Sequence, residues 1–272
     1  MAYGEHPDQV VDVWLPVGPS GPSPLVIFVH GGFWRAKYDR RHTRPLSVDL
    51  ARRGYAVAAI EYRRTGQPGG GWPGTFDDVA AALDATPRLV AAATGGEQAG
   101  AAMTGGSEAR PVIVAGHSAG GHLALWAAVR HRLPETAPWR LTGPPPYAGV
   151  LALAPVADLA AAHRQRLGSD AAGDLLGGGP DDVPDRYAAT DPSALPPPAA
   201  PTTLVHGALD DRVPPDHSRD YTARKAARLV EIPDAEHFAV IDPLSAAWPT
   251  VLKALADLTS GSGVRSVPDP PT

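Results

Sequence analysis

A serine in a glycine-rich turn is the residue of this sequence best placed to do covalent chemistry. Residues 112–121 read V-I-V-A-G-H-S-A-G-G, an apolar run that enters a turn with Ser118 at its centre. Two small residues, Gly116 and Gly120, flank the serine and allow a strand and the following helix to come close together. A serine held in this way stands at a helix N-terminus, where free N–H groups stabilise negative charge. The pattern G-x-S-x-G therefore predicts a nucleophile at Ser118.

Ser118 needs a general base, because a serine hydroxyl stays protonated near neutral pH. Nine of the ten histidines are poor candidates. Five lie in polar segments that we expect to face solvent, two end strands before glycine turns, and two are too close to the serine to turn back onto it. In that order they are His6, His42, His131, His163 and His217; His30 and His206; His117 and His122. The remaining histidine, His237, follows the last expected strand, and we predict that it is the base.

The base in turn needs a carboxylate that holds its tautomer and stabilises the imidazolium. Asp210 follows an expected strand, residues 202–206, through a short glycine turn. It therefore emerges at the carboxyl edge of the sheet, where open α/β sheets place their sites. The sequence leaves two alternatives open, Asp211 beside it and Asp158 after the preceding strand. We expect the chosen carboxylate to meet His237 at that edge.

A second glycine turn can bind the oxygen of a tetrahedral intermediate. Gly31-Gly32-Phe33 directly follows a buried apolar run at residues 25–30. We expect the N–H groups of Gly32 and Phe33, together with that of Ala119, to form an oxyanion hole. The sequence contains no H-E-x-x-H motif, no calcium loop and no phosphate-binding loop, so we expect no metal and no cofactor.

Alternating strands and helices must position these residues. Apolar runs of strand length alternate with stretches of helical periodicity, which predicts an α/β fold with a mostly parallel sheet covered by helices on both faces. The expected strands are residues 10–15, 25–30, 55–60, 112–115, 147–153, 202–206 and 228–232, and the expected helices are residues 45–54, 75–87, 121–132, 215–227 and 244–258. Thr75 is the expected N-cap of its helix, and Pro87 is expected to kink or end that helix.

The chain reads as one domain over residues 1–258, followed by a loose tail over residues 259–272. The segment from about residue 155 to 200 separates two strands and is rich in glycine, proline and aspartate. An insertion of this length is typical of a cover or lid. Residues 94–110 are small and weakly patterned, and we expect a surface excursion there.

The composition excludes several classes of function. The chain has 272 residues, 43% of them hydrophobic, a formal charge of −5 and a pI near 6.0, so neither nucleic acid nor an anionic membrane surface is an expected partner. It has no apolar run long enough to span a membrane, and its first residues do not resemble a secretory signal. The absence of cysteine excludes disulfides and thiolate catalysis and permits a cytoplasmic location.

Four motifs together resemble the α/β-hydrolase superfamily. They are H-G-G-F-W at residues 30–34, G-H-S-A-G-G at residues 116–121, H-G-x-x-D-x-x-V-P at residues 206–214, and H-F at residues 237–238. The H-G-G turn is similar to that of the esterase branch, and a tryptophan in the fifth position resembles the kynurenine formamidase (arylformamidase) group. Phenylalanine stands here where tyrosine is common in that pentad. The resemblance implies the α/β-hydrolase fold, a triad of Ser118, Asp210 and His237, and an oxyanion hole in the H-G-G turn.

We therefore expect a serine hydrolase that cleaves a small-molecule ester or amide through an acyl-enzyme. A formamidase acting on N-formylkynurenine and a short-chain carboxylesterase are the leading alternatives, followed by a peptidase of the prolyl-oligopeptidase type. A non-enzymatic binding module on the same fold is the contrasting class, and the presence of all three triad residues argues against it. We expect Trp34, Tyr62, Trp72 and Phe238, with Phe33, to line an aromatic pocket. The oligomeric state stays open, with a homodimer as one alternative.

Overall fold

A seven-stranded sheet forms the centre of the structure. The computed structural model describes residues 1–16, 23–94 and 110–261. Within these residues the strand order is β1-β3-β2-β4-β5-β6-β7; β1 is antiparallel to β3 and every other pairing is parallel. The strands are β1 (Val11–Trp14), β2 (Leu25–Val29), β3 (Ala56–Ile60), β4 (Val112–His117), β5 (Gly149–Leu153), β6 (Thr202–Gly207) and β7 (Arg228–Ile232). The prediction of a mostly parallel sheet is confirmed.

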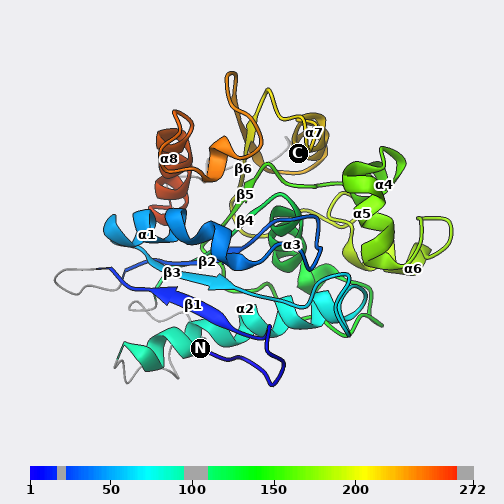
Figure 1. Cartoon of the computed structure of the whole chain (residues 1–272), viewed down its shortest axis with the longest axis horizontal. Coiled ribbons are helices and arrows are strands. Elements are labelled where there is room, and N and C mark those ends of the chain that lie inside the picture. The colour runs from blue at the N-terminus through cyan, green and yellow to red at the C-terminus, as the bar shows by residue number, and fades with distance from the viewer. Residues whose placement is uncertain (17–22, 95–109, 262–272) are drawn as a thin grey trace, which may run out of the picture.

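Helices cover both faces of the sheet, because the side chains of its inner strands alternate between two hydrophobic layers. In β2, for example, Ile27 belongs to one layer and Phe28 to the other. One layer includes residues of α2, α3 and α7, and the other includes residues of α1 and α8. Figure 1 shows α1 and α8 on one side of the sheet and α2 on the opposite side. These helices are α1 (Arg44–Arg52), α2 (Gly74–Ala93), α3 (Ala119–Ala128), α7 (Asp216–Arg224) and α8 (Trp248–Thr259).

The prediction that Thr75 caps α2 is wrong, and of the two alternatives predicted at Pro87, a kink or an end, the structure excludes the end. The helix begins at Gly74, so Thr75 lies inside its first turn, where its hydroxyl donates to the carbonyl of Arg63 instead of capping the helix. Pro87 does not end the helix, which continues to Ala93. An internal proline costs a helix about 3 kcal/mol, but Val90, in the turn after it, is buried in the layer beneath α2 and stabilises the continuation. Most of the excursion predicted after α2 lies outside the described residues.

The last helix begins later than predicted. Helix α8 begins at Trp248, which puts Pro249 in its first turn, where a proline costs no hydrogen bond. Leu244, predicted to lie on the apolar face of this helix, precedes it and is 94% exposed. The buried face is formed by Trp248, Val251 and Leu255 instead. Of the predicted tail, residues 262–272 lie outside the described residues.

Three further helices occupy the segment between β5 and β6 that was predicted to be a cover. They are α4 (Leu159–Arg164), α5 (Leu167–Leu176) and α6 (Pro184–Thr190). Figure 1 shows them grouped at one end of the molecule. Ala162, Leu175 and Tyr187, one residue from each helix, are buried in the same layer as α2 and α3, so the segment packs onto the main core. Among the helices of the described residues, none is long and apolar enough to cross a membrane.

Candidate active site

Ser118 lies in a strained turn between β4 and α3. It is the single residue between the strand and the helix, and its backbone has φ 56° and ψ −118°, a conformation that is unfavourable for a residue with a side chain. The flanking glycines allow the close approach that was predicted. A side chain at Gly116 would collide with the backbone of Gly120, and one at Gly120 would collide with the carbonyl of Val29 in β2. The local sequence thus forces the serine to the end of the sheet.

His237 and Asp210 are joined by a buried hydrogen bond. His237 lies in the loop after β7, and its Nδ1 donates to Asp210 Oδ2 at 2.6 Å. The other carboxylate oxygen of Asp210 accepts the backbone N–H groups of Arg212 and Val213 at 2.8 and 2.9 Å. Burial alone raises the pKa of Asp210, but the hydrogen bonds from His206 and His237 outweigh it and hold the pKa well below its usual range. Asp210 is therefore ionised at neutral pH.

The two alternative carboxylates lie elsewhere. The Asp211 side chain is 78% exposed and pairs with Arg212. Asp158 caps α4, where it accepts the backbone N–H of Ala161 at 2.6 Å. Of the three aspartates considered from the sequence, only Asp210 contacts His237 in the described residues.

Ser118 and His237 come from neighbouring loops, although no hydrogen bond joins their side chains within the described part of the chain. The contact between the loops runs through His117, the residue before the serine. The rings of His117 and His237 lie 4.5 Å apart, and His117 Nε2 donates to the main-chain carbonyl of His237 at 3.0 Å. Ser118 and His237 are both almost completely buried. The structure therefore brings the predicted serine and histidine to adjacent places.

The H-G-G turn lies directly against the serine. A methyl group added to Gly31 would lie 3.1 Å from Ser118 Cβ and 2.8 Å from the carbonyl oxygen of His117. The backbone N–H groups of Gly32, Phe33 and Ala119 donate to no other group of the described residues. The three groups predicted to form an oxyanion hole are thus unpaired and come from two segments in contact.

A buried charged network holds this turn, and sequence reasoning missed its central residue. Glu61, directly after β3, accepts hydrogen bonds from His30 Nε2 at 2.7 Å and from the N–H of Arg40 at 3.0 Å, and it lies 3.2 Å from Arg64. Burial by itself raises the pKa of Glu61, but the hydrogen bond and charge of His30, followed by the charge of Arg64, outweigh it and lower the pKa to about 2. A glutamate directly after a fully apolar strand was the signal that could have identified it.

Two of the aromatic residues predicted to line a substrate pocket are buried in the structure. Tyr62 is 0% exposed; its ring stacks on His30 and its hydroxyl donates to the carbonyl of His30. Trp34 is 1% exposed and packs edge-on against His122 in the layer beneath α3. The Tyr62 ring therefore contacts the H-G-G turn through His30, and the Trp34 ring packs into the layer beneath α3.

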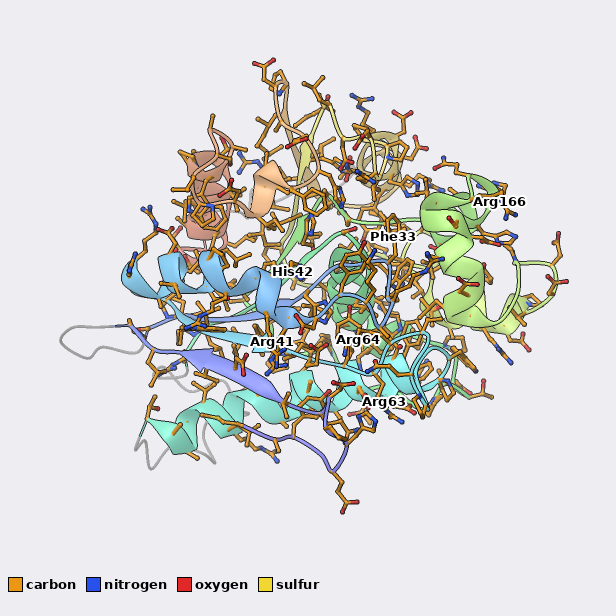
Figure 2. The ribbon with its side chains drawn as sticks, in the orientation of Figure 1. Phe33, Arg41, His42, Arg63, Arg64 and Arg166 are labelled. Carbon is orange, nitrogen blue, oxygen red and sulfur yellow. The ribbon has the colours of Figure 1, made fainter. Side chains whose placement is uncertain are left out.

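The other aromatic residues differ in exposure. Trp72 is half-buried and packs against Trp139, with the two ring centroids 5.1 Å apart. Phe238 is 53% exposed, with its ring 5.0 Å from that of His237. Figure 2 shows Phe33 at the end of α3, on the side that faces α4 and α5. Its ring lies against Gly168 of α5, where an added methyl group would come within 2.7 Å of it.

The remaining histidines behave mostly as expected. His30 and His206 were expected to brace loops, and both are buried and hydrogen-bonded. His217 is a correction: predicted to face solvent, it is buried and hydrogen-bonded through Nε2 to Gln165 at 3.1 Å. The reason is the segment between β5 and β6, whose Gln165 contacts the start of α7. No cluster of metal-binding side chains occurs among the described residues.

The sheet is mostly parallel, a serine lies in the strained turn after β4, and an aspartate and a histidine follow β6 and β7. This arrangement defines the α/β-hydrolase fold. The BD-FAE family matches residues 11–224, and the chain belongs to this family. Solved structures share the fold. A truncated carbohydrate esterase from gut microbiota superposes with a TM-score of 0.75 at 19% identity, covering 97% of this chain and 95% of the other. Esterase B of Lactobacillus rhamnosis superposes with a TM-score of 0.69 at 23% identity, covering 96% and 85%.

Similar sequences include several named enzymes. Esterase LipC of Mycobacterium tuberculosis is 33% identical over 138 residues, and a probable isoprenylcysteine alpha-carbonyl methylesterase of rice is 32% identical over 141 residues. Each alignment covers 50% of this chain but only 30 and 29% of the relative. The zebrafish kynurenine formamidase is 37% identical over 62 residues, which are 23% of this chain and 21% of that enzyme. This chain therefore aligns with less than a third of the length of each relative.

Proposed function

We propose that the protein is a serine hydrolase of small esters, with Ser118 as nucleophile, His237 as general base and Asp210 as its orienting carboxylate. The observation that carries the proposal is the 2.6 Å hydrogen bond between His237 and Asp210. The loop that contains His237 also contacts the Ser118 turn, through His117. The names of the relatives, two of which are esterases similar over half of this chain, support the same class of reaction.

The tautomer of His237 fits the role of base. Nδ1 carries a proton, because it donates to the ionised carboxylate of Asp210. In the neutral ring the lone pair is then on Nε2, which can accept the proton of Ser118 as its Oγ bonds to the carbonyl carbon of the substrate. The imidazolium that results is stabilised by Asp210 and returns the proton to the leaving alcohol or amine. Water then repeats the sequence on the acyl-enzyme and releases the acid.

The N–H groups of Gly32, Phe33 and Ala119 stabilise the oxygen of each tetrahedral intermediate. Their lack of other partners supports this role, because they need no rearrangement to donate to a negative oxygen. The H-G-G turn packs against the serine and is fixed at His30 by Glu61 and by the buried Tyr62, which keeps these donors in one position.

A set of p-nitrophenyl esters tests the proposal. The native protein should hydrolyse the acetate and butyrate faster than the octanoate, and Ser118→Ala should lose about three orders of magnitude or more in kcat/KM while it still folds. A serine-directed organophosphorus probe should add once to the native protein and not to Ser118→Ala, as read by intact mass. Activity or labelling that survives in the variant would place the nucleophile elsewhere.

Hydrolysis of an aryl formamide is the second candidate. It is favoured by the pentad H-G-G-F-W and by the short stretch of similarity to kynurenine formamidase. The deciding quantity is kcat/KM on N-formylkynurenine. If this value is below about 10² M⁻¹s⁻¹, under the usual range for a true substrate, while esters are hydrolysed rapidly, the formamidase candidate is rejected. The esterase is then the one candidate that remains.

A further inference from the structure

His117 joins the Ser118 turn to the loop that contains His237, the two segments that carry the proposed nucleophile and base. It ends β4 and precedes Ser118, and its side chain reaches across to the loop of His237, 120 residues further along the chain. Its Nε2 donates to the main-chain carbonyl of His237 at 3.0 Å, and the two rings are packed at 4.5 Å. Within the described part of the chain, no other hydrogen bond joins residues 116–121 to residues 233–240.

The His117 ring is built to donate at one fixed position. The side chain is 1% exposed, and burial, followed by the nearby His237 ring, lowers its pKa well below the ordinary value for histidine. The ring is therefore neutral at neutral pH and carries one N–H. A carbonyl oxygen can only accept, so that proton is on Nε2. Nδ1 faces Gly31 and has no hydrogen-bond partner in the structure.

We propose that His117 is a positioning residue: its Nε2–H fixes the backbone of His237, and thereby the distance from the His237 ring to Ser118. The inference rests on the function proposed above and assigns no chemical step to His117. The Asp210 bond restrains the His237 ring from one side, at Nδ1, while His117 restrains the backbone that carries the ring. Because Ser118 and His237 share no hydrogen bond here, the His117 contact is what sets their separation.

The proposal requires an N–H donor at the position of His117 Nε2, and two substitutions test this requirement. The amide nitrogen of glutamine can occupy the place of histidine Nε2, whereas the shorter asparagine places its amide near Nδ1 and cannot reach the carbonyl of His237. His117→Gln should therefore keep kcat within about threefold of the native value, and His117→Asn should lower kcat by roughly 10- to 100-fold with KM little changed, because misplacement of a catalytic group acts mainly on kcat.

His122 provides a matched control. It is also buried, its Nε2 also donates to a carbonyl at 3.0 Å, and its Nδ1 also has no partner, but the acceptor is Thr190 at the end of α6. His122→Asn should lower the midpoint of thermal unfolding by an amount similar to His117→Asn, and it should leave kcat within about twofold of the native value, since it moves no group of the proposed triad.

A spectroscopic measurement separates positioning from general destabilisation. The proton that His237 Nδ1 donates to Asp210 should give a far-downfield NMR resonance in the native protein and in His117→Gln, and this resonance should broaden or move in His117→Asn but not in His122→Asn. Equal kcat in the two His117 variants, or equal losses of kcat in His117→Asn and His122→Asn, would overturn the proposal. Ser118→Ala, measured beside them, reports on the serine mechanism itself: loss of activity there with unaffected His117 variants refutes the positioning role alone.

Discussion

His206 and Asp210 are joined by a buried hydrogen bond of 3.1 Å, so a second imidazole holds the carboxylate that His237 contacts. His206 is itself fixed by Ser218 at its other ring nitrogen. Asp210 thus has four protein donors, two from rings and two from the backbone of residues 212 and 213. Each of them favours the ionised carboxylate, so in the proposed mechanism Asp210 orients His237 and stabilises its charge without taking its proton.

Asp210→Asn should lower kcat/KM for p-nitrophenyl acetate by roughly 10³- to 10⁴-fold, because an amide in place of the carboxylate favours the wrong tautomer of His237. Asp211→Asn is the matched control, since Asp211 is exposed and contacts only Arg212 among the described residues. It should keep full activity. A dead Asp211 variant beside an active Asp210 variant would contradict the assignment.

Much of this arrangement was predictable from the sequence, for a local reason. Residues 25–29 and 56–60 are continuous apolar runs, and such runs form strands buried on both faces wherever the topology is α/β. The turn at Ser118 was predictable because Gly116 and Gly120 permit a backbone approach that any side chain would block.

What the sequence could not predict depends on contacts made across the fold. The helix continues past Pro87 because Val90 is packed beneath it, and Tyr62 and Trp34 are buried because they pack on His30 and His122 within the core. An aromatic residue beside a motif looks the same in a sequence whether it faces a substrate or the core. The choice between Asp210 and Asp211 is of the same kind, since it depends on which carboxylate the loop turns inward.

The network around Glu61 predicts a specific dependence of stability on pH. The Glu61 pKa falls from an ordinary value of 4.5 to about 2 in the folded protein. A carboxylate with a lowered pKa stabilises the fold above its unfolded pKa, and this stabilisation is lost as the pH falls toward the folded pKa. Between pH 5 and pH 2.5 the free energy of unfolding of the native protein should therefore fall by about 1–3 kcal/mol more than that of Glu61→Gln.

Urea unfolding followed by circular dichroism at a series of pH values measures this difference. Glu236→Gln, which changes an exposed glutamate, should follow the native pH dependence. If Glu61→Gln also follows it, the low pKa of Glu61 is not a source of stability.

Gly31→Ala tests whether the H-G-G turn must touch the serine. The added methyl group would lie 2.8 Å from the carbonyl oxygen of His117, a contact that forces the backbone to move. The N–H donors beside Ser118 would shift with it, and kcat should fall by at least about tenfold, since small displacements in an active site are costly. Gly143→Ala, at a position with no neighbour within 4 Å of the new methyl group, should be neutral in both kcat and thermal unfolding. Unchanged kcat in Gly31→Ala would show that the turn does not act on the reaction.

Phe33 should set the length of the acyl chain that the protein accepts. Its N–H is one of the proposed oxyanion donors, and its ring lies against Gly168 of α5, on the side of α3 that faces α5 (Figure 2). Phe33→Ala keeps the N–H and removes the ring. The ratio of kcat/KM for p-nitrophenyl octanoate to that for the acetate should then rise about tenfold, within the range that apolar pocket contacts supply.

The contact between Phe33 and Gly168 allows a double-mutant test of the same point. Gly168→Ala alone puts a methyl group 2.7 Å from the ring, at a residue with φ 57°, where a side chain costs about 1 kcal/mol or more. It should lower the activity on every ester. In the double variant Phe33→Ala/Gly168→Ala the clash is gone, so the destabilisation that remains should come only from the side chain at the positive φ of residue 168. The preference for long acyl chains should equal that of Phe33→Ala. If the octanoate-to-acetate ratio stays at the native value in both Phe33→Ala and the double variant, the selectivity role of Phe33 is refuted.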